Sequence, residues 1–496
     1  MELTGVTVDT NIAIVGAGFG GLGAAIALKR EGIDDFVILE RARDVGGTWR
    51  DNSYPGCACD VQSHLYSFSF ALNPRWTRYY PRQPEIWEYL RRCADEFGIV
   101  PHIRIDHEMR SASWDETTLR WRIETSRGSV SASKLILANG PLSDPVVPRL
   151  EGLERFDGRV FHSAQWDHGY DLSGKRVAVV GTGASAIQFI PEIQPTVKTL
   201  HVFQRTPPWI IPRFDPTLKA WQRRLLAIPA VHRLVRGVIY GARELMVLPF
   251  RQPALMRRVQ RRALRHMHKA IDEPGLREKL TPRYTMGCKR VLLSDDYYPA
   301  LTHPNVEVVT AGIGEVRARS IVDDEGIERS VDAIILGTGF QATDPPIAKH
   351  IRGRDGRTLA AAWAGSPKAY MGTTVASFPN LFILLGPNTG LGHTSVVYMI
   401  ESQIEHVMKV LRYMRRNRIA ALEPRADAQA AFVADVERRM RGTVWVAGGC
   451  KSWYLDRTGR NSALWPDFSW RFRRRVARLD PSAYEAPTRG RRPAAA

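Results

Sequence analysis

Two glycine-rich turns, each between an apolar run and a helix-forming segment, constrain the fold of this chain more than any other feature. The first turn follows Asn11 to Val15, and the second follows Arg176 to Val180. Small residues let the chain turn tightly beside a phosphate, and the next helix points its N-terminal N–H groups at that phosphate. The turns therefore predict two Rossmann-like dinucleotide-binding units. Their residues are Gly16, Ala17, Gly18, Phe19, Gly20 and Gly21 in the first, and Gly181, Thr182, Gly183, Ala184, Ser185 and Ala186 in the second.

The residues that end the next strand of each unit carry opposite charges. Glu40 lies 24 positions after Gly16, and Arg205 lies 24 positions after Gly181. A carboxylate accepts hydrogen bonds from ribose hydroxyls but repels a 2′-phosphate, whereas a guanidinium pairs with that phosphate. The first unit is therefore predicted to bind FAD and the second to bind NADPH.

Two further apolar runs, Lys134 to Gly140 and Ala333 to Phe340, end in small residues on either side of the second unit. They predict an α/β fold in which an NADPH-binding domain is inserted into an FAD-binding domain. We expect the first part of the FAD domain at residues 1–145, the NADPH domain at 146–335 and the second part of the FAD domain at 336–470. A basic tail, residues 471–496, is expected to be disordered.

The net charge of +19 is concentrated in two segments. Residues 217–270 carry a net charge of +12 and residues 471–492 carry +6, so the rest of the chain is close to neutral. This distribution argues against a nucleic-acid-binding protein, whose positive charge would be spread along the chain among aromatic residues.

The first basic segment belongs to an expected helical insertion at about 214–280. It mixes arginines with leucines and valines and is broken at Pro229, Pro249 and Pro253. The favoured interpretation is a helical cap over the substrate pocket with a solvated, arginine-rich face. Peripheral membrane contact through residues 217–270 is the alternative.

The five cysteines do not form a recognisable disulfide framework, and none has the spacing of a metal site. The chain has neither a signal-peptide pattern nor an uninterrupted apolar run of about 18 residues. These observations predict a cytoplasmic protein without a bound metal.

Four other stretches carry a resemblance to a known family. Residues 156–167 match the pattern FxGxxxHxxxW followed by Asp, with Phe156, Gly158, His162, Trp166 and Asp167 at the defining positions. The others are Gly46-Gly47-Thr48-Trp49 with Tyr54-Pro55-Gly56 and Asp60, then Lys289-Arg290 with Tyr297-Tyr298, and Gly386 to Gly390. From Ile12 to about Pro466 the chain resembles class B flavoprotein monooxygenases and, in this form, type I Baeyer-Villiger monooxygenases. Asp167 stands where many members have proline, and Ala186 replaces a common third glycine.

The resemblance implies that NADPH reduces FAD, that O2 gives a C4a-peroxyflavin, and that one oxygen atom is inserted next to the carbonyl of a hydrophobic ketone. The attacking peroxide is an anion, so a fixed cation is needed beside it. Arg290 is the predicted catalytic cation and Asp60 its counter-charge. Arg205 and Lys289 are predicted to hold the 2′-phosphate, with a hydroxyl from Thr206.

The resemblance also implies the remaining contacts. FAD is expected to meet Gly47, Thr48, Trp49, Asp60, Tyr66, Met109, Asn388 and Thr389, beside the first turn and Glu40. NADPH is expected to meet Gln188 and Arg290, beside the second turn. Phe156, Gly158, His162, Trp166 and Asp167 are predicted to couple the movements of the two domains.

Two other functions use the same pair of cofactors. N- or S-oxygenation is the main alternative, because Asp167 also occurs in the wider family. A disulfide reductase is a remote alternative: Cys57 and Cys59 follow the flavin-side motif, but they are one residue apart instead of in a CxxC motif.

Overall fold

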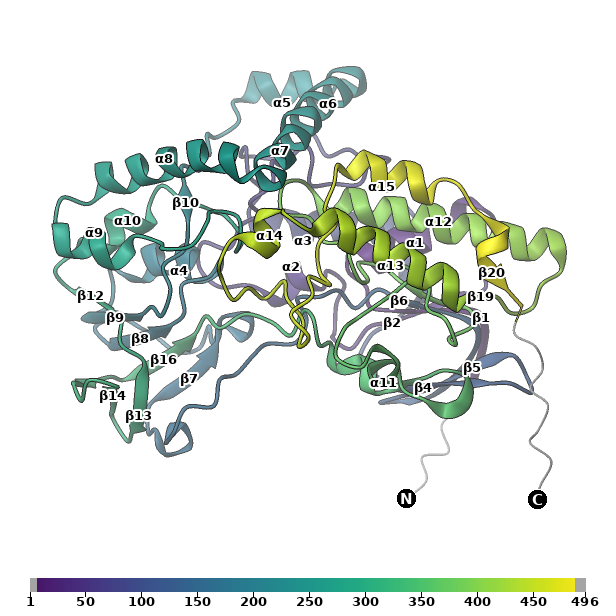
Figure 1. Ribbon diagram of the computed structural model, residues 1–496, viewed down its shortest axis with the longest axis horizontal. Helices are drawn as coiled ribbons and strands as arrows, with labels where there is room; N and C mark the ends of the chain where they lie inside the picture. The colour runs from purple at the N-terminus through teal and green to yellow at the C-terminus, as the bar shows by residue number, and fades with distance from the viewer. Residues whose placement is uncertain (1–6, 487–496) are drawn as a thin grey trace.

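The computed structural model describes residues 7–486. Two β-sheets, each flanked by helices, form two neighbouring lobes, one on the right and one on the left of Figure 1. A row of helices, α8, α7, α6 and α15, runs along the upper side of both lobes (Figure 1).

The first sheet is built around the apolar run that precedes the first glycine turn. Strand β1 (Val8–Val15) pairs in parallel with β2 (Phe36–Leu39) on one side and with β6 (Gly128–Leu137) on the other. Within the described residues the strand order is β17-β4-β5-β6-β1-β2-β3, with β18 also beside β6. The other bounds are β3 Ile103–Arg104, β4 Met109–Asp115, β5 Arg120–Thr125, β17 Ile351–Arg352 and β18 Leu381–Ile383.

Helices cover this sheet because their apolar sides face it. Helix α1 (Phe19–Arg30) follows the first turn directly and packs against the long helix α12 (Val396–Asn417). The other helices of this part of the chain are α2 (Thr48–Asp51), α3 (Gln83–Glu96), α11 (Leu359–Trp363), α13 (Ala426–Met440) and α14 (Val444–Ala447).

The second sheet is parallel and has the order β12-β9-β8-β16-β7. Its strands are β7 (Arg159–His162), β8 (Arg176–Val180), β9 (Thr199–Phe203), β12 (Val306–Val309) and β16 (Ala333–Leu336). Helix α4 (Ala186–Ile193) follows the second turn, and α10 (Tyr297–Leu301) packs against it. All five strands fall between β6 and β18 of the first sheet in the sequence. The prediction of one dinucleotide-binding domain inserted into another is therefore confirmed.

The two segments that cross between the lobes lie next to each other. Pro145 pairs with Phe340 in an isolated antiparallel bridge. The backbone N–H of Val146 donates to the carbonyl oxygen of Gly339 at 2.8 Å. The NADPH-side lobe is thus attached to the first lobe through two adjacent crossing segments.

The basic segment folds into helices, as expected. They are α5 (Ala220–Leu226), α6 (Pro229–Leu245), α7 (Val247–Arg251), α8 (Pro253–Ala270) and α9 (Pro274–Leu280). Pro229 and Pro253 begin helices, where the missing N–H costs nothing. Pro249 lies inside α7.

The expected solvated arginine face exists on α8 but not on α6. On α8 the exposed residues include Arg257, Arg258, Arg261, Arg262 and Arg265. On α6, by contrast, Arg236 and Arg243 turn inward and donate hydrogen bonds to residues 60–67. The expectation is therefore wrong for α6, because its inward arginines find backbone and side-chain acceptors in a distant loop.

Within residues 7–486, no single helix combines the length and apolar character that crossing a membrane requires. Helix α5 and the α6–α7 segment together have the length and composition of a membrane span, but the chain bends by 98° between them.

The expectation of disorder from residue 471 onward is wrong for residues 471–486. Helix α15 (Ser469–Val476) packs on α12 through Phe472 and Val476, which are fully buried. Strand β20 (Tyr484–Glu485) then pairs with β19 (Glu423–Pro424). Arginines surround Phe472 and Val476 in the sequence. Because these two apolar residues are four positions apart, they lie on one helix face. Residues 487–496 lie outside the described part.

The expectation about cysteines also needs correction, because Cys288 and Cys450 form a disulfide. They are 162 residues apart in the sequence, so their spacing carried no signal. Cys57, Cys59 and Cys93 are free and buried.

Candidate active site

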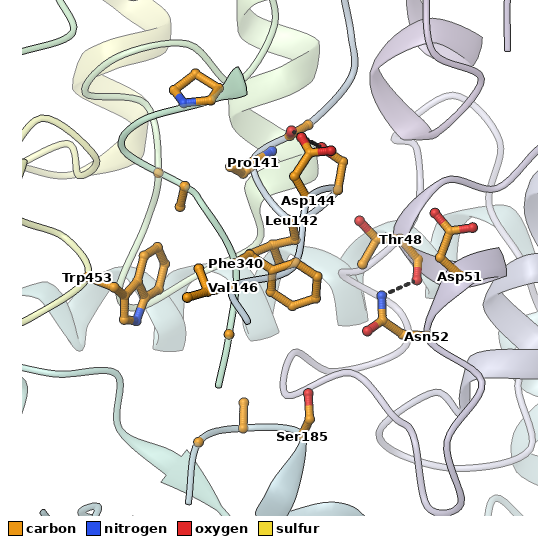
Figure 2. Close-up of a pocket in the computed structure, with 18 of the residues that line it drawn as sticks. Thr48, Asp51, Asn52, Pro141, Leu142, Asp144, Val146, Ser185, Phe340 and Trp453 are labelled. Atoms are coloured by element: carbon orange, nitrogen blue, oxygen red, sulfur yellow. Dashed lines mark hydrogen bonds between the residues drawn. The ribbon is translucent and has the colours of Figure 1, made fainter. Parts of the chain in front are cut away.

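A cavity of about 1570 Å³ lies between the two lobes and is lined by both glycine turns. This is larger than the roughly 300–1,000 Å³ of a typical pocket for one small molecule. In Figure 2, Thr48 reaches the cavity from the flavin side and Ser185 from the second turn, with Trp453 on the opposite wall. Leu142, Val146 and Phe340 of the two crossing segments lie between them (Figure 2). The space is large enough for two ligands that meet at the domain crossing.

The first turn has the geometry that close contact with a phosphate requires. Gly16 has a φ of +99°, and a Cβ on Gly21 would lie 1.8 Å from the Gly16 carbonyl oxygen. A Cβ on Gly18, by contrast, would have no neighbour nearer than 3.8 Å. The backbone at Gly18 is therefore open to the cavity, while Gly21 lets the helix pack tightly behind it.

Glu40 lines the same cavity and is almost completely buried. Its Oε2 accepts a hydrogen bond from the Ala17 N–H at 2.8 Å, and its Oε1 accepts from the Ala42 N–H and from Arg50, both at 3.0 Å. These donors stabilise the carboxylate at the end of β2 and fix it beside the turn. Its position fits a ribose of bound FAD.

The second turn repeats this arrangement on the other side of the cavity. Gly181 has a φ of +104°, and a Cβ there would lie 2.5 Å from the Gly337 carbonyl oxygen. Gly183 is open to the cavity, because a Cβ there would have no neighbour nearer than 3.9 Å. The backbone of this turn can thus approach a second pyrophosphate.

Arg205 and Lys289 lie close enough to influence each other electrostatically, and both line the cavity. Burial and the neighbouring charge of Arg205 lower the pKa of Lys289. Neither side chain forms an ion pair with a carboxylate of residues 7–486. Two adjacent cations without a counter-charge suit an anion such as the 2′-phosphate of NADPH.

Asp60 and Arg290 form a two-pronged ion pair on the wall of the cavity. Arg290 Nε donates to Oδ2 of Asp60 at 2.8 Å, and Nη2 donates to Oδ1 at 2.7 Å. Burial acts to raise the pKa of Asp60, but the charge of Arg290 outweighs it, so the pKa is lowered. In turn, the charge of Asp60 raises the pKa of Arg290. Both groups are therefore charged at neutral pH.

Three further residues lie beside this pair or on the cavity wall, and none of them belongs to a sequence motif. Arg243 of α6 donates to the backbone oxygen of Asp60 at 2.9 Å and to Gln62 at 2.7 Å. Burial raises the pKa of Tyr454 to about 12, although the charge of nearby Arg290 acts to lower it. Trp453 lines the cavity (Figure 2). Arg243 lies in the basic insertion, and the two aromatic residues lie in a loop without a recognisable pattern.

Most of the predicted cofactor residues line the cavity. On the FAD side these are Gly16, Gly18, Phe19, Gly20, Glu40, Gly47, Thr48, Trp49, Asp60, Tyr66 and Met109. On the NADPH side they are Gly181, Thr182, Gly183, Ala184, Ser185, Gln188, Arg205, Thr206, Lys289 and Arg290. Gly21 and Ala186 instead pack behind their turns.

Asn388 and Thr389 lie behind the wall instead of on it. Asn388 Nδ2 donates to the carbonyl oxygens of Asn461 and Leu464, and the Thr389 hydroxyl donates to Gly386. The neighbouring Pro387 and Gly390 reach the cavity. The two predicted side chains thus brace the loop that faces the flavin side.

The residues of the FxGxxxHxxxW pattern lie outside the cavity wall. His162 ends β7 beside the crossing segment, with its ring 5.8 Å from that of Phe340, and burial lowers its pKa. Trp166 packs on Phe189 of α4 at 5.2 Å, and Phe189 packs on Tyr54 at 6.0 Å.

The other pattern residues have structural contacts. Asp167 pairs with Arg159, and Phe156 contacts the core of the second lobe. A Cβ on Gly158 would lie 2.4 Å from the Asp332 carbonyl oxygen. The pattern therefore joins the second lobe to the flavin-side loop without touching the cavity.

Two dinucleotide turns on one cavity, with opposite charges at their strand ends, define a flavoprotein oxidoreductase that also binds a nicotinamide dinucleotide. Residues 13–232 match the family described as pyridine nucleotide-disulphide oxidoreductase. The chain is 53% identical over 477 residues to a Baeyer-Villiger monooxygenase of Streptomyces coelicolor, covering 96% of this chain and 92% of that protein.

Solved structures agree with this relationship. The NADP⁺-bound cyclohexanone monooxygenase of Rhodococcus sp. Phi1 has a TM-score of 0.86 and 29% identity, covering 97% of this chain and 99% of that one. The OTEMO complex with FAD and NADP has a TM-score of 0.89 and 26% identity, covering 96% and 99%.

The chain belongs to the Baeyer-Villiger monooxygenases. The predictions of this family, of its two dinucleotide-binding domains and of an FAD- and NADPH-dependent monooxygenase are confirmed. The disulfide-reductase alternative is not favoured, since Cys57 and Cys59 are free and burial raises the pKa of both thiols. The relatives likewise do not favour N- or S-oxygenation as the main activity.

Proposed function

We propose that this enzyme inserts one oxygen atom from O2 next to the carbonyl group of a hydrophobic ketone, giving an ester or a lactone. The observation that carries the proposal is the Arg290–Asp60 pair on the wall of a cavity that both dinucleotide turns also line. A fixed cation at that point is what an oxygen-insertion reaction on a carbonyl group requires.

FAD bound here and reduced by NADPH would supply the activated oxygen for this reaction. The open backbone around Gly18 and the fixed carboxylate of Glu40 would hold the flavin cofactor's pyrophosphate and ribose. Trp49 forms a flat apolar wall, fixed by a 3.0 Å hydrogen bond from its Nε1 to the Tyr66 hydroxyl. Arg205, Thr206 and Lys289 hold the 2′-phosphate of NADPH.

Arg290 stabilises negative charge on oxygen. When an oxygen nucleophile attacks a carbonyl group, negative charge develops on the carbonyl oxygen, and a preorganised cation lowers the barrier. Asp60 occupies Nε and Nη2 of Arg290, and the guanidinium has further N–H donors for the reacting oxygen. Asp60 is thus a counter-charge that fixes the orientation of the guanidinium without removing its ability to donate.

The surroundings of the pair favour an apolar substrate. A second, smaller cavity of about 60 Å³ adjoins Asp60 and Arg290. Its other walls include Met246, Phe250 and Met256 from the helical insertion. Apolar side chains beside a fixed cation suit a molecule with a hydrocarbon body and a carbonyl group.

The test uses the FAD-loaded enzyme with NADPH, isotopically labelled O2 and three classes of substrate: ketones, sulfides and amines. We expect an ester or lactone that carries one labelled oxygen. Replacing Arg290 by lysine keeps the charge but loses the two-pronged geometry, and should lower the rate of ester formation by about 10²–10³-fold.

An exposed arginine that lines neither cavity provides the control. Arg261→Lys on α8 should leave the rate unchanged. If ketones of varied chain length and ring size give no ester while a sulfide or an amine is oxygenated, the proposal is wrong and the alternative of N- or S-oxygenation is correct.

A further inference from the structure

Helix α6 differs from an ordinary surface helix because charged side chains face the interior beside its buried apolar residue Ile239. A surface helix normally turns its apolar side inward and its charged side to water. In α6, Arg236, Arg243 and Glu244 point into the molecule and make hydrogen bonds there. These three charged side chains are therefore absent from the outward face of α6.

The inward contacts fix the orientation of the helix. Arg236 donates to the carbonyl oxygens of His64 and Ser67 at 3.0 Å, and Arg243 donates to that of Asp60 at 2.9 Å. Glu244 accepts from the N–H and the hydroxyl of Ser469 at 2.9 and 2.6 Å. Leaving the half-buried Arg236 and Arg243 and the buried Glu244 without partners would be costly, so the helix cannot rotate Leu234, Val238 and Leu245 inward.

The outward face of α6 is apolar along its length. Leu234, Val238 and Leu245 are 68%, 65% and 62% exposed. The exposed positions between and beside them are small, being Ala230, Gly237, Gly241 and Ala242. Their spacing of three or four residues places them in one stripe. Arg233 is the exposed charged residue of α6.

The short helix α5 and the turn that follows it expose further apolar residues. Trp221 is 61% exposed, and Leu225 and Ile228 are also exposed. Figure 1 shows α5 and α6 at the upper edge of the molecule, projecting beyond both lobes. We define the apolar face by Trp221, Leu225, Ile228, Leu234, Val238 and Leu245. Contiguous exposed apolar surface of this kind marks a binding site on a folded protein.

Positive charge borders the apolar face on both sides. Helix α5 itself exposes Arg223 and Arg224. Helix α8, joined to α6 through α7, exposes the arginine row Arg257, Arg258, Arg261, Arg262 and Arg265. Helix α15, whose Ser469 bonds to Glu244, exposes Arg471 and Arg474. Between residues 217 and 270 the one acidic residue is Glu244, which is buried.

We propose that α5 and α6 dock on the surface of an anionic lipid bilayer. The apolar face enters the boundary between headgroups and acyl chains, and the bordering arginines contact lipid phosphates. A second copy of the chain fits this surface less well, because it would bring the same arginines against each other. An uncharged apolar partner would leave the arginine border without a counter-charge.

Docking in this orientation relates the bilayer to the reaction site. The inner side of α6 holds Asp60, and α7 and α8 form the wall of the 60 Å³ cavity that adjoins Arg290. A ketone dissolved in the bilayer would therefore meet the protein at the helices that line this cavity. The docking itself does not depend on the proposed reaction, and it is tested without turnover.

The experiment is co-sedimentation of the full, FAD-loaded chain with vesicles. The vesicles consist of phosphatidylcholine alone or of phosphatidylcholine mixed with anionic phosphatidylglycerol. We expect binding to the anionic vesicles at low salt, with affinity about tenfold or more above that for neutral vesicles. High salt should weaken this binding by about fivefold or more.

The double variant Leu234→Glu/Val238→Glu should lower the affinity for anionic vesicles by about tenfold or more. A matched control is Val100→Glu/Ile327→Glu, which changes two other exposed apolar residues outside the apolar face. It should bind like the unchanged protein. FAD content and circular dichroism establish that each variant is folded.

A second variant keeps the test decisive if the first does not fold. Arg258→Ser/Arg261→Ser/Arg262→Ser on α8 removes exposed charges and should reduce anionic binding without affecting neutral vesicles. Equal sedimentation with and without anionic lipid would overturn the proposal. So would a dimer in sedimentation velocity that Leu234→Glu/Val238→Glu abolishes, with no lipid binding, because the apolar face would then be an interface between copies.

Discussion

Arg290 donates two hydrogen bonds to Asp60 across a sequence separation of 230 residues, joining the second lobe to the flavin-side loop. The side chains are 30% and 24% exposed, so the pair is largely but not completely withdrawn from water. The same contact thus holds the proposed catalytic cation in place and links the two lobes.

Replacing Asp60 by asparagine should reduce both activity and stability. The variant keeps the shape of the side chain but leaves the Arg290 charge without its partner. We expect a decrease in kcat of about 10²-fold and a loss of about 1–3 kcal/mol in the free energy of unfolding, less than for a fully buried pair. Steady-state kinetics and urea unfolding measure the two effects.

The pH dependence of stability should distinguish this pair. Because Arg290 lowers the pKa of Asp60, the stabilisation is fully present above the ordinary aspartate pKa of about 3.9. It is lost as the pH falls through the lower value in the folded protein. The difference in unfolding free energy between the unchanged protein and Asp60→Asn should therefore shrink below about pH 4. A difference that stays constant to lower pH would contradict this assignment.

Cofactor preference should depend on Arg205 and Lys289. Arg205→Gln/Lys289→Met removes two neighbouring cations of the cavity lining, and should raise the KM for NADPH by about 10- to 100-fold. The KM for NADH should change little, because NADH has no 2′-phosphate. Lys198→Met, which changes an exposed lysine of the same lobe, serves as the control. An equal loss with both nucleotides would show that the two residues support the fold and not the phosphate.

Glu40 should be required for retention of FAD. Alanine at this position removes the acceptor of the Ala17 N–H and the partner of Arg50. We expect a lower ratio of flavin to protein absorbance after purification, and a flavin affinity weaker by about tenfold or more. NADPH binding, measured by fluorescence, should persist, since Glu40 lies on the other side of the cavity.

Gln188 connects the NADPH-side helix α4 to the flavin-side loop. Its side chain accepts from the Tyr54 hydroxyl at 3.0 Å and donates to the Ala58 carbonyl oxygen at 2.9 Å. Gln188→Leu keeps the volume but breaks both contacts, so domain movements should become less coordinated. We expect more hydrogen peroxide per NADPH consumed and less ester. Unchanged coupling would show that the aromatic contacts of Trp166, Phe189 and Tyr54 suffice.

The parts of the fold that depend on neighbouring residues could be predicted from the sequence. Each glycine turn, its helix and the charged residue after the next strand lie within a short stretch. The Asp60–Arg290 pair could be reached only through family resemblance, because no local pattern relates residues 230 positions apart. The positions of Arg243 and Tyr454 beside this pair could not be predicted, since they depend on how distant segments pack.

The orientation of α6 could not be predicted from its own sequence either. Its sequence mixes arginines and apolar residues, and an outward arginine face is the ordinary expectation. The partners that turn Arg236 and Arg243 inward lie in residues 60–67, and the partner of Glu244 is Ser469. The face exposed to solvent is thus decided by acceptors and donors far away in the sequence.

The adjacency of the two crossing segments has a consequence for how such a protein can be rebuilt. Since the chain leaves the first lobe near Pro145 and returns near Phe340, paired with each other, the first lobe holds the second as it would hold a long surface loop. Strands β6 and β18 still pair in register on either side of the interruption. The second lobe therefore has neighbouring chain ends. It could be excised, exchanged for that of a relative or circularly permuted without changing the path of the chain through the first lobe.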